Sequence, residues 1–214
     1  MKPFQYLEKN LTGFKPWVHI AVLCIAFSQV TMAQTAVPAP VRLRGEIVEV
    51  NSQALIVKDR AGALLKILVA ESVGIQEAYA VSVQSIQPNS FIGTAALAGS
   101  DGQLKALEVL VFPEAARGTG EGHYPWDLQP GSTMTNATVN KLDSNASNVE
   151  MHLLYKGGEK SVLIPQGVPI VSIRPGTRDL LVTGAQVMIV ANKEADHWNA
   201  VRVVTGKNGF KPPM

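Results

Sequence analysis

A set of five short strand-like segments occurs twice in this chain in the same order, and this repetition constrains the fold more than any other feature. Each segment is rich in Val, Ile, Leu or Thr and is bounded by turn residues such as Asn51-Ser52 or Gly157-Gly158. The pattern predicts an all-β protein with an internal repeat. The first set covers residues 44–50, 54–59, 64–70, 90–97 and 104–112, and the second covers residues 137–142, 149–155, 159–164, 185–191 and 198–204.

Polar and apolar residues partly alternate within the segments. In residues 45–50 and 107–111 the polar side chains fall at partly alternate positions, so one face is expected in a core and the other in water. An isolated set of five strands would leave two open edges, and closure into a small barrel removes them. We therefore expect two tandem five-strand OB-like barrels, residues 42–112 and 136–205, followed by a tail over residues 206–214.

A longer connection separates the third and fourth segments of each set. These connections are residues 71–88 and 165–184, and an OB-like barrel often has a short helix at this place. Residues 77–80 (EAYA) are the only passable helical turn in the first connection. Three prolines, at positions 165, 169 and 175, argue against a helix in the second.

The N-terminal residues have the pattern of a secretory signal peptide. A region with Lys2, Lys9 and Lys15 precedes the apolar run 17–27, and small residues at Thr31 and Ala33 fit cleavage before Gln34. We predict a signal peptide over residues 1–33, a Pro-containing linker over residues 34–41, and a periplasmic or secreted protein. The alternative is an uncleaved anchor, because the basic region is long and contains Glu8.

Cleavage at this place changes the charge and removes the only cysteine. The first 33 residues carry three Lys and one Glu, so sixteen of the 19 basic and sixteen of the 17 acidic residues remain. A net charge of zero argues against nucleic acid as a partner, and no further apolar run is long enough for a membrane span. Cys24 leaves with the leader, so no disulfide is expected. Lipid attachment at Cys24 is disfavoured because Leu23 precedes it.

The segment between the two sets differs from the rest of the chain. Residues 113–135 are rich in Gly and Pro, and aromatic residues such as Trp126 are unusual in a plain linker. We expect an ordered loop that joins the barrels and binds a small ligand or an envelope protein. The candidate ligand-binding residues, expected to be at least half buried where the barrels meet, are Arg117, Glu121, His123, Trp126 and Asp127.

The same loop holds the residues with which the chain would bind a divalent metal, the only cofactor that this loop suggests. The candidate ligands are Glu114, Glu121, His123 and Asp127. One histidine without a second His or Cys nearby argues against a tight zinc site. The alternative is that Glu121 and Asp127 pair with Arg117 and His123 and only pin the loop. Residues 118–122 (GTGEG) lack the lysine and the following helix of a phosphate-binding loop.

No enzyme motif stands out. Ser132 is not in a Gly-x-Ser-x-Gly context, and His152 has the position of an outward-facing strand residue. The leading hypothesis is a non-catalytic periplasmic binding or envelope-associated protein. The alternative is a metal-dependent or hydrolytic enzyme that uses the histidine and carboxylates of the central loop.

Several stretches resemble a family of exported proteobacterial proteins with OB-like domains of unknown function. They are residues 112–123 (FPEAARGTGEGH), 125–128 (PWDL), 130–137 (PGSTMTNA) and 212–214 (PPM). The resemblance covers nearly the whole mature chain and implies the OB-like fold and export. Some members are described as metal ABC transporter permeases, which would imply a membrane channel, whereas this chain has no apolar span after its leader. The resemblance supplies no activity.

Overall fold

The computed structural model describes residues 39–144 and 148–213, and this part of the chain is all-β. It contains thirteen strands, three single turns of 3-10 helix and no α-helix. The predicted signal peptide, its cleavage site and most of the predicted linker lie outside the described residues. The strands are β1 (Val41–Val50), β2 (Ala54–Asp59), β3 (Leu64–Leu68), β4 (Gly74–Ala80), β5 (Phe91–Ala98), β6 (Leu104–Val111), β7 (Gly122–Pro125), β8 (Thr133–Ser144), β9 (Val149–Tyr155), β10 (Gly158–Ile164), β11 (Ile170–Pro175), β12 (Gln186–Lys193) and β13 (Trp198–Gly206). The 3-10 turns are η1 (Val83–Ser85), η2 (Glu114–Ala116) and η3 (Arg178–Leu180).

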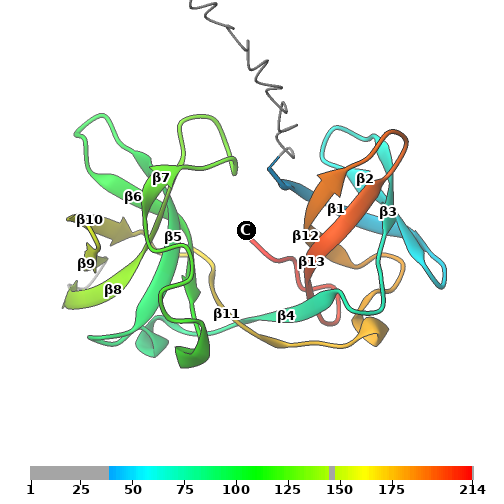
Figure 1. The fold of residues 1–214 in the computed structure, drawn as a ribbon. Coiled ribbons are helices and arrows are strands. Elements are labelled where there is room, and N and C mark those ends of the chain that lie inside the picture. Colours follow the sequence, from blue (N-terminus) through cyan, green and yellow to red (C-terminus); the bar gives the residue numbers. More distant parts are fainter. Residues whose placement is uncertain (1–38, 145–147, 214) are drawn as a thin grey trace, which may run out of the picture. The chain divides into compact units, whose positions relative to one another are not determined.

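All thirteen strands belong to one mixed sheet, in which two groups of five strands can be distinguished (Figure 1). The β8 set consists of β8, β9, β10, β6 and β5, and the β1 set consists of β1, β2, β3, β13 and β12. In each set the pairings return to the strand where they began, because β10 also pairs with β6 and β3 also pairs with β13. Those two pairings are parallel and the others within the sets are antiparallel.

The strands combine differently from the sequence expectation. Residues 42–112 and 136–205 were expected to pair internally, but β5 and β6 pair with β8 and β10, and β12 and β13 pair with β1 and β3. The two repeats have thus exchanged their last two strands. The exchange is possible because the connections 71–88 and 165–184 are long enough to carry each strand pair to the other set.

Strands β4 and β11 form those connections and link the two sets. They pair with each other in antiparallel fashion, with Ala78 opposite Ile173. β4 also pairs in parallel with β13, and β11 pairs in parallel with β6. The predicted helical turn at residues 77–80 is therefore wrong, because strand partners on both sides keep this segment extended.

Each set has its own hydrophobic core, and a third cluster lies along the linking strands. Ile92, Met151 and Leu153 belong to the core of the β8 set, whereas Leu55 and Ile189 belong to that of the β1 set. Residues of β4, β6, β11, β12 and β13 form the third cluster, which contains Ala78, Leu110, Val171, Ile173, Met188 and Val204. The linking strands are therefore packed on apolar side chains of both sets.

Two matching bulges show which positions of the sets are equivalent. Ala95 lies opposite Glu108 and Ala96 opposite Ala106, so β6 has one extra residue at this point. Val190 lies opposite Arg202 and Ala191 opposite Ala200, so β13 has an extra residue at the same point. Glu108 and Arg202 therefore occupy equivalent positions directly after a bulge, a feature that often redirects a side chain beside a functional site.

Among the described residues there is also no helix with the length and apolar character needed to cross a membrane.

Candidate functional site

The segment between β6 and β8 is ordered by backbone pairing and by one serine. β7 pairs with β8, which places His123 opposite Thr135. The Ser132 hydroxyl donates to the carbonyl oxygens of Gln129 at 2.7 Å and of Trp126 at 3.0 Å, and the Trp126 amide donates to the Ser132 carbonyl at 2.8 Å. These bonds close the turn 126–132 and fix the position of the indole.

The five predicted ligand-binding residues have different contact partners, and most of them are used within the protein. Trp126 and His123 are partly buried, whereas Arg117, Glu121 and Asp127 are exposed. Arg117 pairs with Glu114, with 2.6 Å between Nε and Oε1. The carboxylate of Glu121 accepts a hydrogen bond from the backbone amide of Lys156, and His123 Nδ1 lies 2.8 Å from Thr135 Oγ1.

The predicted metal ligands do not converge. Glu114 is engaged by Arg117, and Asp127 accepts a hydrogen bond from Arg44 at 2.8 Å. Among residues 39–144 and 148–213 no group of three or more His, Cys, Asp or Glu side chains is arranged to hold a metal ion. The loop is pinned by ionic contacts, but the partners are Glu114 and Arg44 rather than the predicted pairs of Glu121 and Asp127 with Arg117 and His123.

Trp126 and Asp127 connect the loop to β1. The guanidinium of Arg42 lies over the indole of Trp126, 3.9 Å from the ring centre, and its Nη1 is 3.8 Å from Asp127 Oδ2. Burial favours a higher pKa for Asp127, but the hydrogen bond from Arg44 and the charges of Arg44 and Arg42 outweigh it and lower that pKa. Asp127 is therefore ionised at neutral pH and stabilises the position of both arginines.

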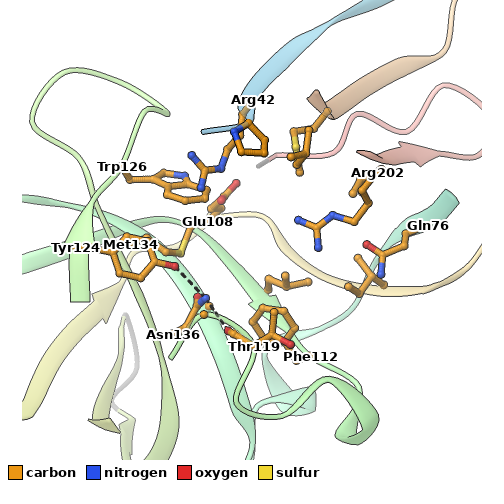
Figure 2. A pocket seen from close by; sticks show the side chains of 18 residues that line it. Arg42, Gln76, Glu108, Phe112, Thr119, Tyr124, Trp126, Met134, Asn136 and Arg202 are labelled. Atoms are coloured by element: carbon orange, nitrogen blue, oxygen red, sulfur yellow. Dashed lines mark hydrogen bonds between the residues drawn. The ribbon is translucent and has the colours of Figure 1, made fainter. Parts of the chain in front are cut away.

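A cavity of about 250 Å³ lies between the β8 set, the β1 set and the loop (Figure 2). The loop contributes Tyr124 and Trp126 to its wall, and the linking strands contribute Gln76 and Ile173. Equivalent positions of the two sets face each other across it. The remaining lining residues are Gly93, Glu108, Leu110, Phe112, Thr119, Gly120, Met134 and Asn136 on one side and Pro40, Arg42, Met188, Val190, Arg202 and Val204 on the other.

Four buried polar side-chain atoms in the described part of the chain lack a hydrogen-bond partner, and all four belong to residues that line this cavity. They are Gln76 Oε1, Glu108 Oε2, Trp126 Nε1 and Asn136 Oδ1. An unpaired buried polar atom costs about 1–3 kcal/mol, so such atoms are rare in folded proteins. Their concentration around one cavity makes this cavity the candidate site.

Glu108 is the most unusual of these residues because it is an acidic side chain only 2% exposed. Burial raises its pKa to about 7, although the charges of Arg44 and Arg60 act in the opposite direction. The sequence pattern of residues 107–111 predicted that Glu108 faces water, and the structure shows that it faces the cavity. A carboxyl group with this pKa changes its charge near neutral pH.

Two arginines provide positive charge to the cavity. Figure 2 shows the guanidinium of Arg202 extended into it from β13, on the opposite side from Glu108. Arg202 makes no hydrogen bond or ion pair with the described residues, and burial, aided by the charge of Arg42, lowers its pKa. Burial also raises the pKa of Tyr124, so this phenol is neutral at physiological pH. The other arginine is Arg42, which stacks on Trp126.

A second group of polar side chains lies on the β8 set, away from the cavity. His152 Nε2 is 2.8 Å from Asp143 Oδ2, and His152 Nδ1 is 2.9 Å from Ser161 Oγ. Asp143 also pairs with Lys141. His152 and Ser161 are directly opposite each other on β9 and β10, beside a surface hollow of about 290 Å³. The sequence predicted His152 as an outward strand residue, but gave no sign of its two partners.

Comparison with protein-family models, with curated proteins and with solved structures gives no match. The resemblance described from the sequence therefore stays a prediction.

Sequence reasoning identified Trp126 but missed the other central residues of the cavity. Arg42 is next to the predicted linker, Gln76 is in a segment with no motif, and Arg202, the only charged residue of its strand, was not singled out by any motif. Glu108 did leave a signal, because it is the only charged residue between Ala106 and Phe112. A single carboxylate within an apolar strand is a candidate for a buried functional group.

Proposed function

We propose that this chain is an exported binding protein that takes a small, partly apolar organic anion into the cavity between its two strand sets. The observation that carries the proposal is the set of four buried polar atoms without partners around one cavity, to which Arg42 and Arg202 add positive charge. Binding a ligand would satisfy these groups and offset the cost of burying them.

The walls and size of the cavity support this ligand class. Apolar side chains from both sets face it, including Leu110, Met134, Met188 and Val204. Its volume of about 250 Å³ is below the range of about 300–1,000 Å³ that is typical of sites for drug-sized ligands. The ligand is therefore a metabolite of modest size with an anionic group and an apolar body.

The export and the barrel architecture are part of the same proposal. The N-terminal pattern supports a periplasmic or secreted location. In both sets the pairing runs from the first strand to the second, third, fifth and fourth and then back to the first, and this five-strand circuit supports two OB-like barrels that have exchanged strands.

Titration calorimetry with small carboxylates tests the proposed function. The panel contains 4-methylpentanoate, phenylpropanoate, leucine and phenylalanine, so that each apolar body occurs with and without an amine. We expect at least one member to bind in a saturable manner, and Arg202→Gln to weaken its binding at least tenfold because a charge-assisted bond is lost. The control is Lys58→Gln, which removes an exposed charge outside the cavity. Absence of binding, or equal loss in the control, would contradict the proposal.

The cluster around His152 favours a second candidate function, ester hydrolysis. If His152 carries its proton on Nε2 and donates a hydrogen bond to Asp143, Nδ1 can accept the proton of the Ser161 hydroxyl as that oxygen attacks an ester carbonyl. The imidazolium then returns the proton to the alcohol oxygen as the ester C–O bond breaks, and water hydrolyses the acyl-serine in the same way. The three groups are then nucleophile, base and orienting carboxylate. This candidate ranks second because the His152 and Asp143 side chains are 35% and 47% exposed, and water competes with their hydrogen bonds.

Hydrolysis of p-nitrophenyl acetate tests this second candidate. We expect a rate above that of free imidazole at the same pH, with loss of the excess in Ser161→Ala and no change in the control Ser100→Ala, an exposed serine in a turn. An equal rate in wild type and Ser161→Ala would exclude Ser161 as a nucleophile.

A further inference from the structure

We propose that the ligand of the cavity is a zwitterion, an α-amino acid with an apolar side chain, whose ammonium group binds at Glu108 and whose carboxylate binds at Arg202 and Arg42. This inference rests on the proposed binding function and specifies its ligand. Three observations carry it: the placement of opposite charges, the excess of acceptor atoms, and the apolar wall.

Opposite charges stand at equivalent positions of the two sets. Glu108 and Arg202 each follow the bulge of their strand and each line the cavity from their own side. They form no ion pair with each other, and the electrostatic partners of Glu108 are Arg44 and Arg60 rather than Arg202. A ligand with a positive and a negative end can bridge the two groups, whereas a simple anion would meet the Glu108 carboxylate as a like charge.

Acceptors outnumber donors among the buried side-chain atoms that lack a hydrogen-bond partner in the described residues. Glu108 Oε2, Gln76 Oε1 and Asn136 Oδ1 are acceptors, and only Trp126 Nε1 is a donor. The Asn136 amide nitrogen is already used, since it donates to Thr119 O at 3.0 Å and to Tyr124 Oη at 3.2 Å (Figure 2). Carboxylate and phosphate groups bring no donors, but an ammonium group brings three. The acceptor atoms therefore call for an amine in the ligand.

The charged groups around Glu108 keep its carboxylate available to an ammonium group. Arg44 is hydrogen-bonded to Asp127, and Arg60 donates to the backbone carbonyl of Leu128 at 3.3 Å. Both lower the pKa of Glu108 by their charge. Arg42 stacks on Trp126 and is directed toward Asp127. Glu108 Oε2 has no hydrogen-bond partner among residues 39–144 and 148–213.

The apolar wall and the volume select the side chain of the amino acid. The cavity is also bordered by Leu110, Met188 and Val204, whose contact favours an aliphatic or aromatic group. A volume of about 250 Å³ accommodates one amino acid of the size of leucine, methionine or phenylalanine. A polar or charged side chain would leave these apolar residues in contact with polar atoms.

A matched set of three ligands tests the inference on the mature protein. Leucine carries both charges, 4-methylpentanoate lacks the amine, and 3-methylbutylamine lacks the carboxylate. We expect leucine to bind most tightly in calorimetry, with at least a tenfold loss when either charge is removed. Equal or tighter binding of 4-methylpentanoate would overturn the zwitterion and leave the proposed anion-binding function intact. Failure of all three, together with the carboxylates of the wider panel, would overturn both.

Two variants test which residue binds each charged group of the ligand. Glu108→Gln should weaken leucine at least tenfold and should not weaken 4-methylpentanoate, whereas Arg202→Gln should weaken both carboxylates and should not weaken 3-methylbutylamine. Glu71→Gln and Lys58→Gln are the controls, since both remove exposed charges that do not line the cavity. Equal affinity of wild type and Glu108→Gln for leucine would overturn the assignment of the ammonium group.

The dependence of binding on pH gives a readout that a merely structural role of Glu108 would not produce. Since ionised Glu108 attracts an ammonium group, leucine should bind about tenfold more tightly at pH 8 than at pH 6. The affinity for 4-methylpentanoate should not rise over this range, and in Glu108→Gln the rise for leucine should disappear. Tighter binding of leucine at pH 6 would contradict the proposal.

Discussion

The β8 set and the β1 set share one pairing scheme and differ in the side chains that they direct toward the cavity. Their bulges coincide, and their buried core positions are apolar in both. At equivalent cavity-lining positions, however, Glu108 stands against Arg202 and Met134 against Arg42. The β8 set also carries the loop between β6 and β8 that contains Trp126, for which the β1 set has no counterpart in the described residues.

This difference indicates which constraints act on the core positions and on the cavity-lining positions. Core positions keep their apolar character because both sets must exclude water from a similar interior. Cavity-lining positions are not under that constraint, and at one equivalent pair of them the two sets carry opposite charges, Glu108 and Arg202. A repeated scaffold can therefore produce an asymmetric binding site when two equivalent faces enclose one cavity.

The largest effect is expected from equivalent core residues. Leu55→Ala in the β1 set and Met151→Ala in the β8 set, both at most 2% exposed, should each lower the free energy of unfolding by about 4 kcal/mol. Because the sets have exchanged strands, either change should shift a single unfolding transition in urea. Two separate transitions, with only one of them shifted, would show that the sets are independent and break the comparison.

The next largest effect is on the free energy of unfolding, and it should depend on pH for Glu108 but not for Arg202. The pKa of Glu108 is raised from 4.5 to about 7 in the folded protein, so the folded state binds its proton more tightly than the unfolded state. Stability from this group is present below pH 4.5 and is lost as the pH rises to 7, with about 3 kcal/mol lost in total.

Glu108→Gln should therefore be more stable than wild type at pH 8 by up to about 3 kcal/mol, with a smaller difference at pH 5. Arg202→Gln should show no such trend, because its charge is not lost in this range. Urea unfolding of both variants at the two pH values measures the effect. A constant difference between Glu108→Gln and wild type across this range would show that Glu108 is ionised in the folded protein like an exposed carboxylate.

A smaller effect is expected in the loop that only the β8 set carries. Trp126→Ala should lower the free energy of unfolding by about 2 kcal/mol, because it removes a partly buried indole and its contact with Arg42. It should also weaken leucine binding. The control is Trp198→Ala on β13, which is also partly buried but does not line the cavity and should leave binding unchanged. Unchanged stability and unchanged binding in Trp126→Ala would show that the loop is only a tether.

The smallest effect is expected from the ion pair that joins the loop to β1. Asp127→Asn should cost less than about 1 kcal/mol, since the Asp127 side chain is 45% exposed and water screens its charge. The loss should shrink further in 1 M NaCl. Thermal unfolding at low and high salt checks this, and a loss that is independent of salt would point to a role other than ion pairing.

The sequence was sufficient to find the ten strands of the two sets, but it did not reveal β4, β7 and β11 or how the strands combine. Runs of β-branched residues between turn residues located the segments of both sets, as in Ala54–Asp59 and Gln186–Lys193. The sequence of residues 77–80 led to the wrong expectation of a helical turn, because Glu and Ala favour helix in isolation. The pairing of this segment with β11 and β13 depends on residues far away in the sequence. The exchange of strands could not be predicted because β5-β6 and β12-β13 have similar apolar patterns, so either pair fits either set.

A residue of the candidate site could be predicted only where its type is unusual for its local sequence. Trp126 was found because an indole is out of place in a Gly-rich segment. Glu108 and Arg202 were not found, because strand alternation assigns such residues to the solvent and only the pairing scheme turns both toward one cavity. The predicted metal ligands fit the chemistry of a metal, but the fold separates Glu114 from Asp127 and provides each with an arginine.

The most direct test of the account is whether β3 pairs with β13 or with β6, because the cavity requires the exchanged arrangement. Leu68 lies opposite Asn199, and Lys105 is the residue of β6 equivalent to Asn199. In the chain from Gln34 onward, which lacks cysteine, the pair Leu68→Cys and Asn199→Cys should form an intramolecular disulfide, seen as a loss of about 2 Da in intact mass that dithiothreitol reverses. The pair Leu68→Cys and Lys105→Cys should stay reduced. The reverse outcome would show that each repeat closes on itself, and would contradict the cavity and its ligand.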